Sequence, residues 1–414
     1  MAGAIPTQVS GGSQKPQHFA FAVMTSLFFI WGFITALNDI LIPHLKEVFS
    51  LNYTQAMLVQ FCFFGAYFIV SPFAGMLIEK IGYRRGIITG LCTIALGCAL
   101  FYPAAEIKVY AVFLLALFVL ASGITLLQVS ANPYVAILGP EKTSASRLNL
   151  AQAINSLGHT LGPLFGTVLI FGAAGAAITA DAVKLPYLIL AAAAVFTALI
   201  FKAMHLPDIQ AQAPSGGEGE KTSVWQHRHL MLGVVAIFLY VGAEVAVGSF
   251  LVNYFAESHI GGLSAKEAGT MVSYYWGAAM IGRFIGAALT RIIAPVYVLA
   301  GNASLAICLI VLSINSVGEM AMWSILAVGF FNSIMFPTIF SLAIGGLGRL
   351  TSRGSGLLCM AIVGGAILPV LQGLVADSTN VQLSFVVPAL AYVYIGWYAL
   401  YGARRNELKT AETL

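Results

Sequence analysis

Four ionisable side chains lie within long apolar stretches of the sequence, namely Asp39, His159, Glu244 and Arg283. A charge in the interior of a membrane costs roughly 3 kcal/mol or more, so each of them marks a candidate functional site. A carboxylate in a partly dry site can take up a proton or ligate Na⁺ through its oxygen atoms. Asp39 and Glu244 are therefore the candidates for cation coupling, and Glu244 is also a candidate for binding a substrate hydroxyl group.

Each of these side chains also has a purely structural interpretation. Asp39 could anchor the outer end of its helix in water, and Glu244 could form a hydrogen bond between helices. His159 could be an interior histidine with satisfied hydrogen bonds. Arg283 lies near the end of its apolar stretch, and we interpret it as reaching the membrane surface or pairing with a carboxylate, not as binding substrate.

Amide side chains recur at helical spacing in the same stretches. Asn149, Gln152, Ser156 and His159 follow at intervals of three or four residues, which places them on one face of a helix. Amides supply donors and acceptors, which suits the hydroxyl groups of a sugar better than an ion alone; the alternative is bonding between helices. Together with Glu244, the candidate substrate-binding residues are Trp31, Gln128, Asn132, Asn149, Gln152, Asn155, His159, Tyr240, Asn253 and Asn332.

The composition indicates a chain embedded in a membrane. Of its 414 residues, 59% are hydrophobic and 9% are charged, which is too few charges to cover a water-facing surface. A helix needs about 20 mostly apolar residues to cross a bilayer, and twelve stretches meet that length. We predict an all-α membrane protein with spans at 18–46, 53–78, 86–103, 109–138, 145–171, 185–204, 229–256, 267–290, 295–314, 318–346, 354–376 and 382–403.

The placement of basic residues predicts the orientation. With both termini inside, fifteen of the 20 Lys and Arg residues fall in inner segments and four fall in outer segments. Such an excess marks the cytoplasmic side. We therefore expect cytoplasmic termini, and we attribute the net charge of +4 to this topology and not to nucleic-acid binding.

The chain is organised as two related halves. The segment 205–228 is rich in Gly, Pro and charged residues, which is typical of a linker, and six spans lie on each side of it. Pro133 and Pro337 occupy similar places about half the chain apart. We predict two pseudo-symmetric six-helix bundles that rock about a shared central site. The expected parts are an N-terminal tail (1–17), a bundle (18–204), the linker (205–228), a second bundle (229–403) and a C-terminal tail (404–414).

The second span ends in a motif, Gly75-Met-Leu-Ile-Glu79-Lys-Ile-Gly82-Tyr-Arg84-Arg85, with a degenerate copy at 286–291. It resembles the signature loop between helices two and three of the major facilitator superfamily. Small residues at 75 and 82 permit close approach and a sharp turn, and Glu79 can pair with Lys80 or with either arginine. The resemblance implies a conformational gate made of Gly75, Glu79, Gly82, Arg84 and Arg85. The alternative is a basic loop that only sets topology.

A finer resemblance covers most of the chain. It rests on segments such as Phe29-Ile-Trp-Gly-Phe33, Leu37-Asn-Asp-Ile-Leu-Ile-Pro43, Ala131-Asn-Pro-Tyr134, Arg147-Leu-Asn-Leu-Ala-Gln152 and Phe336-Pro-Thr-Ile-Phe340. These are similar to the fucose:proton symporter family, and Gly242-Ala-Glu-Val245 is similar to its glucose/galactose branch. Gln128 stands where the fucose-type pattern has a carboxylate, so the proton pathway of that type cannot be transferred whole.

The resemblance implies a secondary symporter that imports a neutral hexose such as glucose or galactose together with H⁺ or Na⁺. Fucose and N-acetylglucosamine remain alternatives, as do an uncoupled facilitator and a drug exporter of the same fold. The sequence has no Walker loop, nucleophile elbow or zinc-type spacing, so we predict neither an enzyme nor a bound cofactor or metal. We expect a multi-pass monomer in a bacterial-type inner membrane, with the sugar and the lipid bilayer as its partners.

Overall fold

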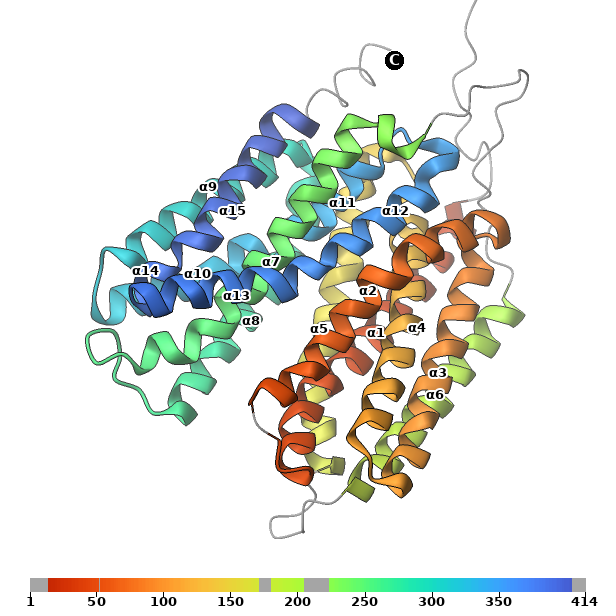
Figure 1. The fold of residues 1–414 in the computed structure, drawn as a ribbon. Helices are drawn as coiled ribbons and strands as arrows, with labels where there is room; N and C mark the ends of the chain where they lie inside the picture. The colour runs from red at the N-terminus through yellow and green to blue at the C-terminus, as the bar shows by residue number, and fades with distance from the viewer. Residues whose placement is uncertain (1–13, 52, 171–179, 205–222, 404–414) are drawn as a thin grey trace, which may run out of the picture.

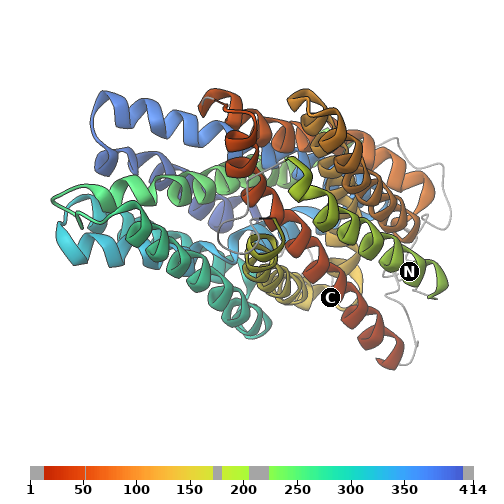
Figure 2. The same cartoon turned by 90° about the horizontal axis from the view of Figure 1, so that it is seen from below.

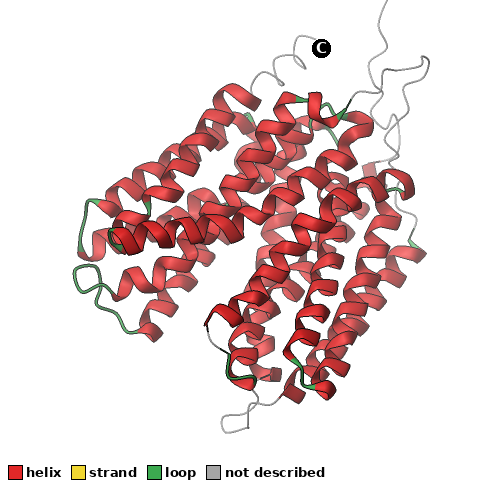
Figure 3. Ribbon diagram, viewed as in Figure 1, coloured by secondary structure: helices red, strands yellow, loops and turns green. Residues whose placement is uncertain are grey.

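The computed structural model describes residues 14–51, 53–170, 180–204 and 223–403, and these ranges are helical, without strands (Figure 3). This confirms the expected all-α class. Most of the side chains at 36–47, 53–57 and 163–170 lie outside the described part. The first half contains α1 (Gln14–Val48), α2 (Tyr53–Ile81), α3 (Tyr83–Ile107), α4 (Tyr110–Ile137), α5 (Ser144–Ile170) and α6 (Lys184–Ala203).

In the second half, three of the expected spans consist of consecutive helical pieces. Two bends lie near prolines, because a proline lacks the N–H that would bond the carbonyl four residues earlier. The elements are α7 (Arg228–Ala256), α8 (Ala265–Ile292), α9 (Pro295–Ile314), α10 (Gly318–Asn332) with α11 (Met335–Ile344), α12 (Thr351–Met360) with α13 (Gly364–Ser378), and α14 (Val381–Ser384) with α15 (Val386–Trp397) and a π-helical turn (Tyr398–Ala403).

These helices form two bundles that lie side by side (Figure 1). Helices α1–α6 pack mainly on one another, and so do α7–α15 except α12, which packs mainly on α2 and α4. The principal contacts between the bundles are α2 with α12 and α5 with α8, followed by α11 with α5 and α12 with α4. Figure 2 shows the two groups from below, with α1 and α5 facing the second bundle. We call the end at which α6 stops and α7 starts the linker end; the C-terminal turn also lies there.

Nine of the described segments are long and apolar enough to cross a membrane. The three remaining spans are α1, α5 and α8. The apolar stretch found in α1, Phe19–Thr35, has 17 residues and is too short for that count, whereas α5 and α8 carry polar side chains in their middle turns. Because α5 and α8 pack against each other across the bundle boundary, their polar groups face protein and are shielded from lipid.

Within each bundle, glycines allow helix backbones to touch. A Cβ on Gly97 of α3 would lie 2.4 Å from the backbone nitrogen of Leu120 in α4. A backbone atom cannot move aside as a flexible side chain can. In contrast, a Cβ on Gly301 of α9 would meet nothing within 4 Å. Gly97 is therefore required for the packing of α3 on α4, whereas Gly301 affects only the conformational entropy of the unfolded chain.

We expect Gly97→Ala to lower stability by about 1–3 kcal/mol, because overpacking forces α3 and α4 apart. The matched change Gly301→Ala should be neutral or stabilising by up to about 1 kcal/mol, because alanine reduces the freedom of the unfolded chain. Thermal unfolding of both purified variants in detergent measures the difference. Equal midpoints would contradict the close contact between the two helices.

Candidate functional site between the bundles

The side chain of Arg283 joins the two bundles at the level of Glu244 in α7. The Arg283 side chain of α8 donates a hydrogen bond from Nε to the carbonyl of Ser333 at 3.1 Å. One terminal nitrogen lies 3.2 Å from Oε1 of Glu244 in α7. The other donates to Oγ of Ser156 in α5, which belongs to the first bundle. The guanidinium group has five N–H donors in a fixed plane, so one side chain can serve all three acceptors.

The break between α10 and α11 supplies one of these acceptors. Pro337 has no N–H, so the carbonyl of Ser333, four residues earlier, has no donor within the helix. Arg283 provides that donor. An unpaired buried carbonyl would cost about 1–3 kcal/mol. The proline and the arginine therefore form one structural unit, although they lie in different helices.

The ion pair between Arg283 and Glu244 is well shielded, with exposed side-chain fractions of 15% and 13%. Two opposite charges in this position compensate each other, whereas either one alone would be costly. The expectation that Arg283 pairs with a carboxylate is met here. Its additional bond to Ser156 places it in the candidate site itself, which the sequence did not indicate.

Amide groups from α4 and α5 continue this polar layer in the first bundle. Nε2 of Gln152 donates to Oδ1 of Asn132 at 3.3 Å, and Nδ2 of Asn155 donates to the carbonyl of Phe28 at 2.9 Å. His159 lies close enough to Arg283 to interact with its charge. The structure thus brings together the predicted residues of α5 with Glu244.

Several polar atoms of the predicted residues are buried without a hydrogen-bond partner in the described part of the chain. Buried polar atoms are nearly always paired, so unpaired ones call for a ligand or water. Five of the ten such side-chain atoms belong to candidate binding residues: Gln128 Oε1, Asn132 Nδ2, Asn149 Oδ1, Tyr240 Oη and Asn332 Oδ1. Half of the unpaired atoms therefore belong to the predicted set.

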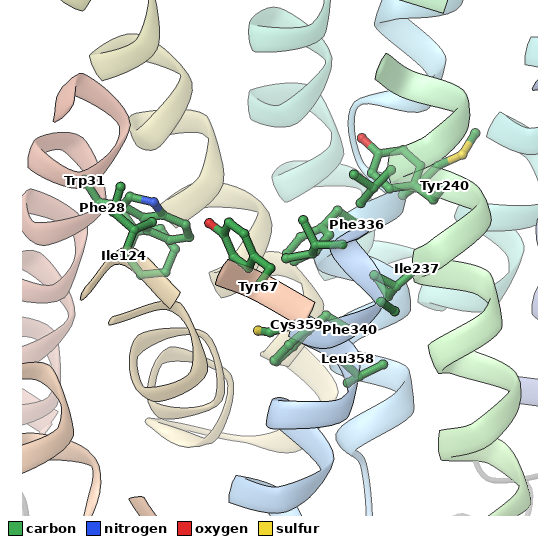
Figure 4. Close-up of a cluster of buried hydrophobic side chains, with 14 of the residues drawn as sticks. Phe28, Trp31, Tyr67, Ile124, Ile237, Tyr240, Phe336, Phe340, Leu358 and Cys359 are labelled. Atoms are coloured by element: carbon green, nitrogen blue, oxygen red, sulfur yellow. The ribbon is translucent and has the colours of Figure 1, made fainter. Parts of the chain in front are cut away.

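Aromatic side chains of both bundles lie near the bundle boundary (Figure 4). Trp31 packs on Phe28 with ring centroids 5.1 Å apart. Tyr67 of α2 lies between this pair and Phe336 of α11, beside Cys359 of α12. Tyr240 lies one turn from Glu244, near its charge but outside hydrogen-bonding geometry. These rings come from α1, α2, α7 and α11, so both bundles contribute to them.

Three of the predicted site residues are not part of this group. Asn253 is exposed; it follows Glu244 by nine residues, which is half a revolution around α7. Asn332 lies inside the second bundle, where Nδ2 donates to the hydroxyl groups of Tyr275 and Tyr392 at 2.6 and 3.1 Å. Asp39 falls in α1, but its side chain lies outside the described part of the chain.

At the linker end the bundles are held together by polar contacts. Oε2 of Glu79 accepts from Nε of Arg353 in α12 at 2.6 Å, and the hydroxyl groups of Ser352 and Tyr83 are 3.1 Å apart. Ser355 donates to the carbonyl of Val129 at 2.9 Å. Val129 precedes Pro133 by four residues, so its carbonyl also lacks a helical donor.

The gate expected at the end of α2 needs one correction. Glu79 pairs with Arg353 of the other bundle, and Arg84 instead donates to the carbonyls of Phe201 and Lys202. Gly75 does provide close approach, because a Cβ there would lie 2.8 Å from the carbonyl oxygen of Ser352.

The turn itself is as expected. Gly82 is the single residue between α2 and α3, and its φ of 82° lies in the region that favours glycine. Arg85 is exposed at the start of α3, so the two arginines of the motif take no part in the contact with the second bundle. The partner of Glu79, Arg353, lies in the first turn of α12 and not in the 286–291 copy of the motif, so the repeat gave no signal for this pairing.

The sequence and the fold are similar to those of known membrane transporters. The model of the Major Facilitator Superfamily matches residues 19–362. A glucose/galactose transporter of Brucella abortus is 57% identical over 98% of this chain and 100% of its own length. The L-fucose-proton symporter of Escherichia coli is 37% identical over 94% of each chain. A crystal structure of a Major Facilitator Superfamily transporter in the outward conformation superimposes with a TM-score of 0.86 at 36% identity, covering 94% of this chain and 99% of the other.

We expect Glu244→Gln to destabilise the protein by about 3 kcal/mol, because it leaves the Arg283 charge without its counter-charge. In detergent this should lower the unfolding midpoint by several degrees. The double variant Glu244→Gln/Arg283→Gln should recover more than half of the loss, and Glu319→Gln, at an exposed site, should cause none. Additive losses in the double variant would show that the pair is not coupled.

Glu79→Gln removes the charge that holds Arg353, so contact at the linker end should weaken by up to about 1 kcal/mol. Cys359 is buried at the bundle boundary and reports on this contact. In a background with the other four cysteines replaced by serine, it should react with maleimide about twofold to fivefold faster in the variant. Lys80→Gln is the control, because Lys80 is exposed in the same loop. An unchanged rate in Glu79→Gln would argue against the gate.

Proposed function

The chain belongs to the Major Facilitator Superfamily, and from this premise we propose that it imports a neutral hexose, glucose or galactose, together with a proton. The observation that carries the proposal is the polar layer built by Arg283, Glu244 and Ser156 across the bundle boundary. A relative with 57% identity is named a glucose/galactose transporter, and one with 37% identity is named an L-fucose-proton symporter. Fucose and N-acetylglucosamine are the alternative substrates.

The sugar would bind between the bundles, where unpaired amide atoms and aromatic rings are available to it. Gln128 and Asn132 offer an acceptor and a donor that have no partner in the described part of the chain, and Gln152 lies within bonding distance of Asn132. Hydroxyl groups of a pyranose can satisfy both kinds of atom. Trp31 and Tyr67 supply apolar rings on which the carbon face of the sugar can pack.

Glu244 would carry the coupling proton. When the carboxylate is ionised, it pairs with Arg283, which also binds Ser156 of the first bundle. Protonation removes the charge attraction, so the guanidinium group is free to move with α8. The proton state of one side chain thereby alters a contact between the bundles, as coupled alternating access requires. Asp39 remains a second candidate for coupling, on the grounds of its position in the sequence.

Orientation and gating complete the cycle. The basic residues place the linker end in the cytoplasm, so closure by Glu79 and Arg353 corresponds to a site open to the outside. The entry of one proton releases about 2.3 kcal/mol of free energy per 100 mV of membrane potential, whereas the entry of a neutral sugar releases none. That energy corresponds to roughly fortyfold accumulation of sugar for each proton. We expect the protein to act as a monomer in the inner membrane.

Reconstitution into liposomes tests this proposal. Labelled glucose, galactose, fucose and N-acetylglucosamine are offered with an inward proton gradient or an inward Na⁺ gradient, imposed separately. We expect accumulation of glucose or galactose above the equilibrium level with the proton gradient only. Glu244→Gln should abolish accumulation while exchange of labelled for unlabelled sugar continues, because exchange needs no net proton movement.

Each opposite result has a definite meaning. Accumulation driven by Na⁺ alone would reject proton coupling. Equilibration without accumulation in the unchanged protein would support an uncoupled facilitator. Retention of full accumulation by Glu244→Gln would exclude Glu244 as the coupling residue. Asn253→Ala is the matched control, because this exposed amide lies on the opposite face of α7 and should leave uptake unchanged.

A further inference from the structure

A groove of about 470 Å³ lies between α3 and α6, on the face of the first bundle that points away from the second bundle. Its linker end is lined by Arg84, Arg85 and Lys202, and its wall further along is apolar. The cations come together because the two helices are antiparallel, so α3 starts where α6 ends. This is also where the two arginines of the signature loop point, since neither contacts Glu79.

The positive charge at this end of the groove is uncompensated in the described part of the chain. None of the three cations lies within 4.0 Å of a described carboxylate, and Glu79, the acid of the same loop, is taken by Arg353. Arg84 covers the carbonyls of Phe201 and Lys202 with bonds of 3.2 and 2.7 Å. It therefore masks the negative end of the α6 dipole, which would otherwise repel an anion.

The wall of the groove continues into the surface that faces lipid. Val195 and Leu199 of α6 are 46% and 57% exposed, within a helix that is apolar enough to cross the membrane. From Val195 to Lys202 the helix rises by about 10 Å. This distance takes the groove from the level of lipid head groups into the hydrocarbon region.

We propose that this groove binds an anionic phospholipid, with its phosphate on Arg85 and Lys202 and one acyl chain along Ile88, Val195 and Leu199. Arginine and lysine provide donors for phosphate oxygens, and basic pockets between membrane helices bind such head groups. A free phosphate ion would use the cations but not the apolar wall. The inference does not depend on the proposed sugar or on the coupling ion.

Native mass spectrometry of the full chain in detergent tests the site directly. Phosphatidylglycerol and phosphatidylcholine with identical acyl chains are added separately, and retained lipid is counted. The unchanged protein should retain phosphatidylglycerol preferentially. Arg85→Gln/Lys202→Gln should weaken that retention about thirtyfold, since each cation near a head group contributes a factor of about five to the affinity. The charge-preserving variant Arg85→Lys/Lys202→Arg should retain it.

A matched control and a competitor complete the experiment. Arg291→Gln removes an exposed cation at the linker end of α8, outside the groove, and should leave retention unchanged. Inorganic phosphate at millimolar concentration should not displace the lipid. Equal retention of the two lipids, unchanged retention in the double variant, or displacement by phosphate would each overturn the proposal. Unfolding midpoints of all variants verify that they are folded.

Discussion

The guanidinium group of Arg283 is the contact on which the candidate site depends. It satisfies the carbonyl of Ser333, compensates the charge of Glu244 and reaches Ser156 of the other bundle. No acidic or amide side chain could do all three, because a carboxylate has no donor and an amide has two, whereas the guanidinium group has five in a fixed plane. An ionisable carboxylate can be kept at this depth because its counter-charge is built into the neighbouring helix.

Two prolines at equivalent places in the repeat serve related purposes. Pro337 frees the Ser333 carbonyl, which Arg283 occupies within the second bundle. Pro133 leaves the Val129 carbonyl without a helical donor, and Ser355 of the second bundle donates a hydrogen bond to it. In a membrane each freed carbonyl needs a donor from elsewhere in the protein. The prolines thus create acceptors at which other helices dock, and one of these acceptors joins the two bundles.

The polar contacts that join the bundles at the linker end are weak, which suits a protein that must separate the bundles. Glu79 and Arg353 are partly exposed, at 33% and 48%, and such pairs contribute only about 0–1 kcal/mol. Gly75 and Gly356 let α2 and α12 touch without interlocking side chains. The interior of each bundle is large and apolar by comparison. Rigid bundles with a weak boundary can move as bodies, which is the requirement for alternating access.

The sequence by itself determined the helical class, the membrane spans and the polar side chains whose burial in a membrane requires a function. Apolar runs of membrane length predict helices within a few residues, because hydrocarbon leaves the backbone no other partner. Intramembrane Glu244 and the amides of α5 stand out because their burial is costly. The position of Asn253 on the far face of α7 could also have been derived, since nine residues make two and a half turns.

Only the tertiary structure decided which partner each group meets. Glu79 had three basic neighbours in its own loop and pairs with none of them, because α12 brings Arg353 closer. Arg84 and Arg85 turn towards α6, whose terminal carbonyls need donors. Arg283 could have reached the membrane surface, but the carbonyl freed by Pro337 and the Glu244 carboxylate hold it inward. Such choices depend on how helices distant in sequence approach each other, and helical periodicity carries no information about that.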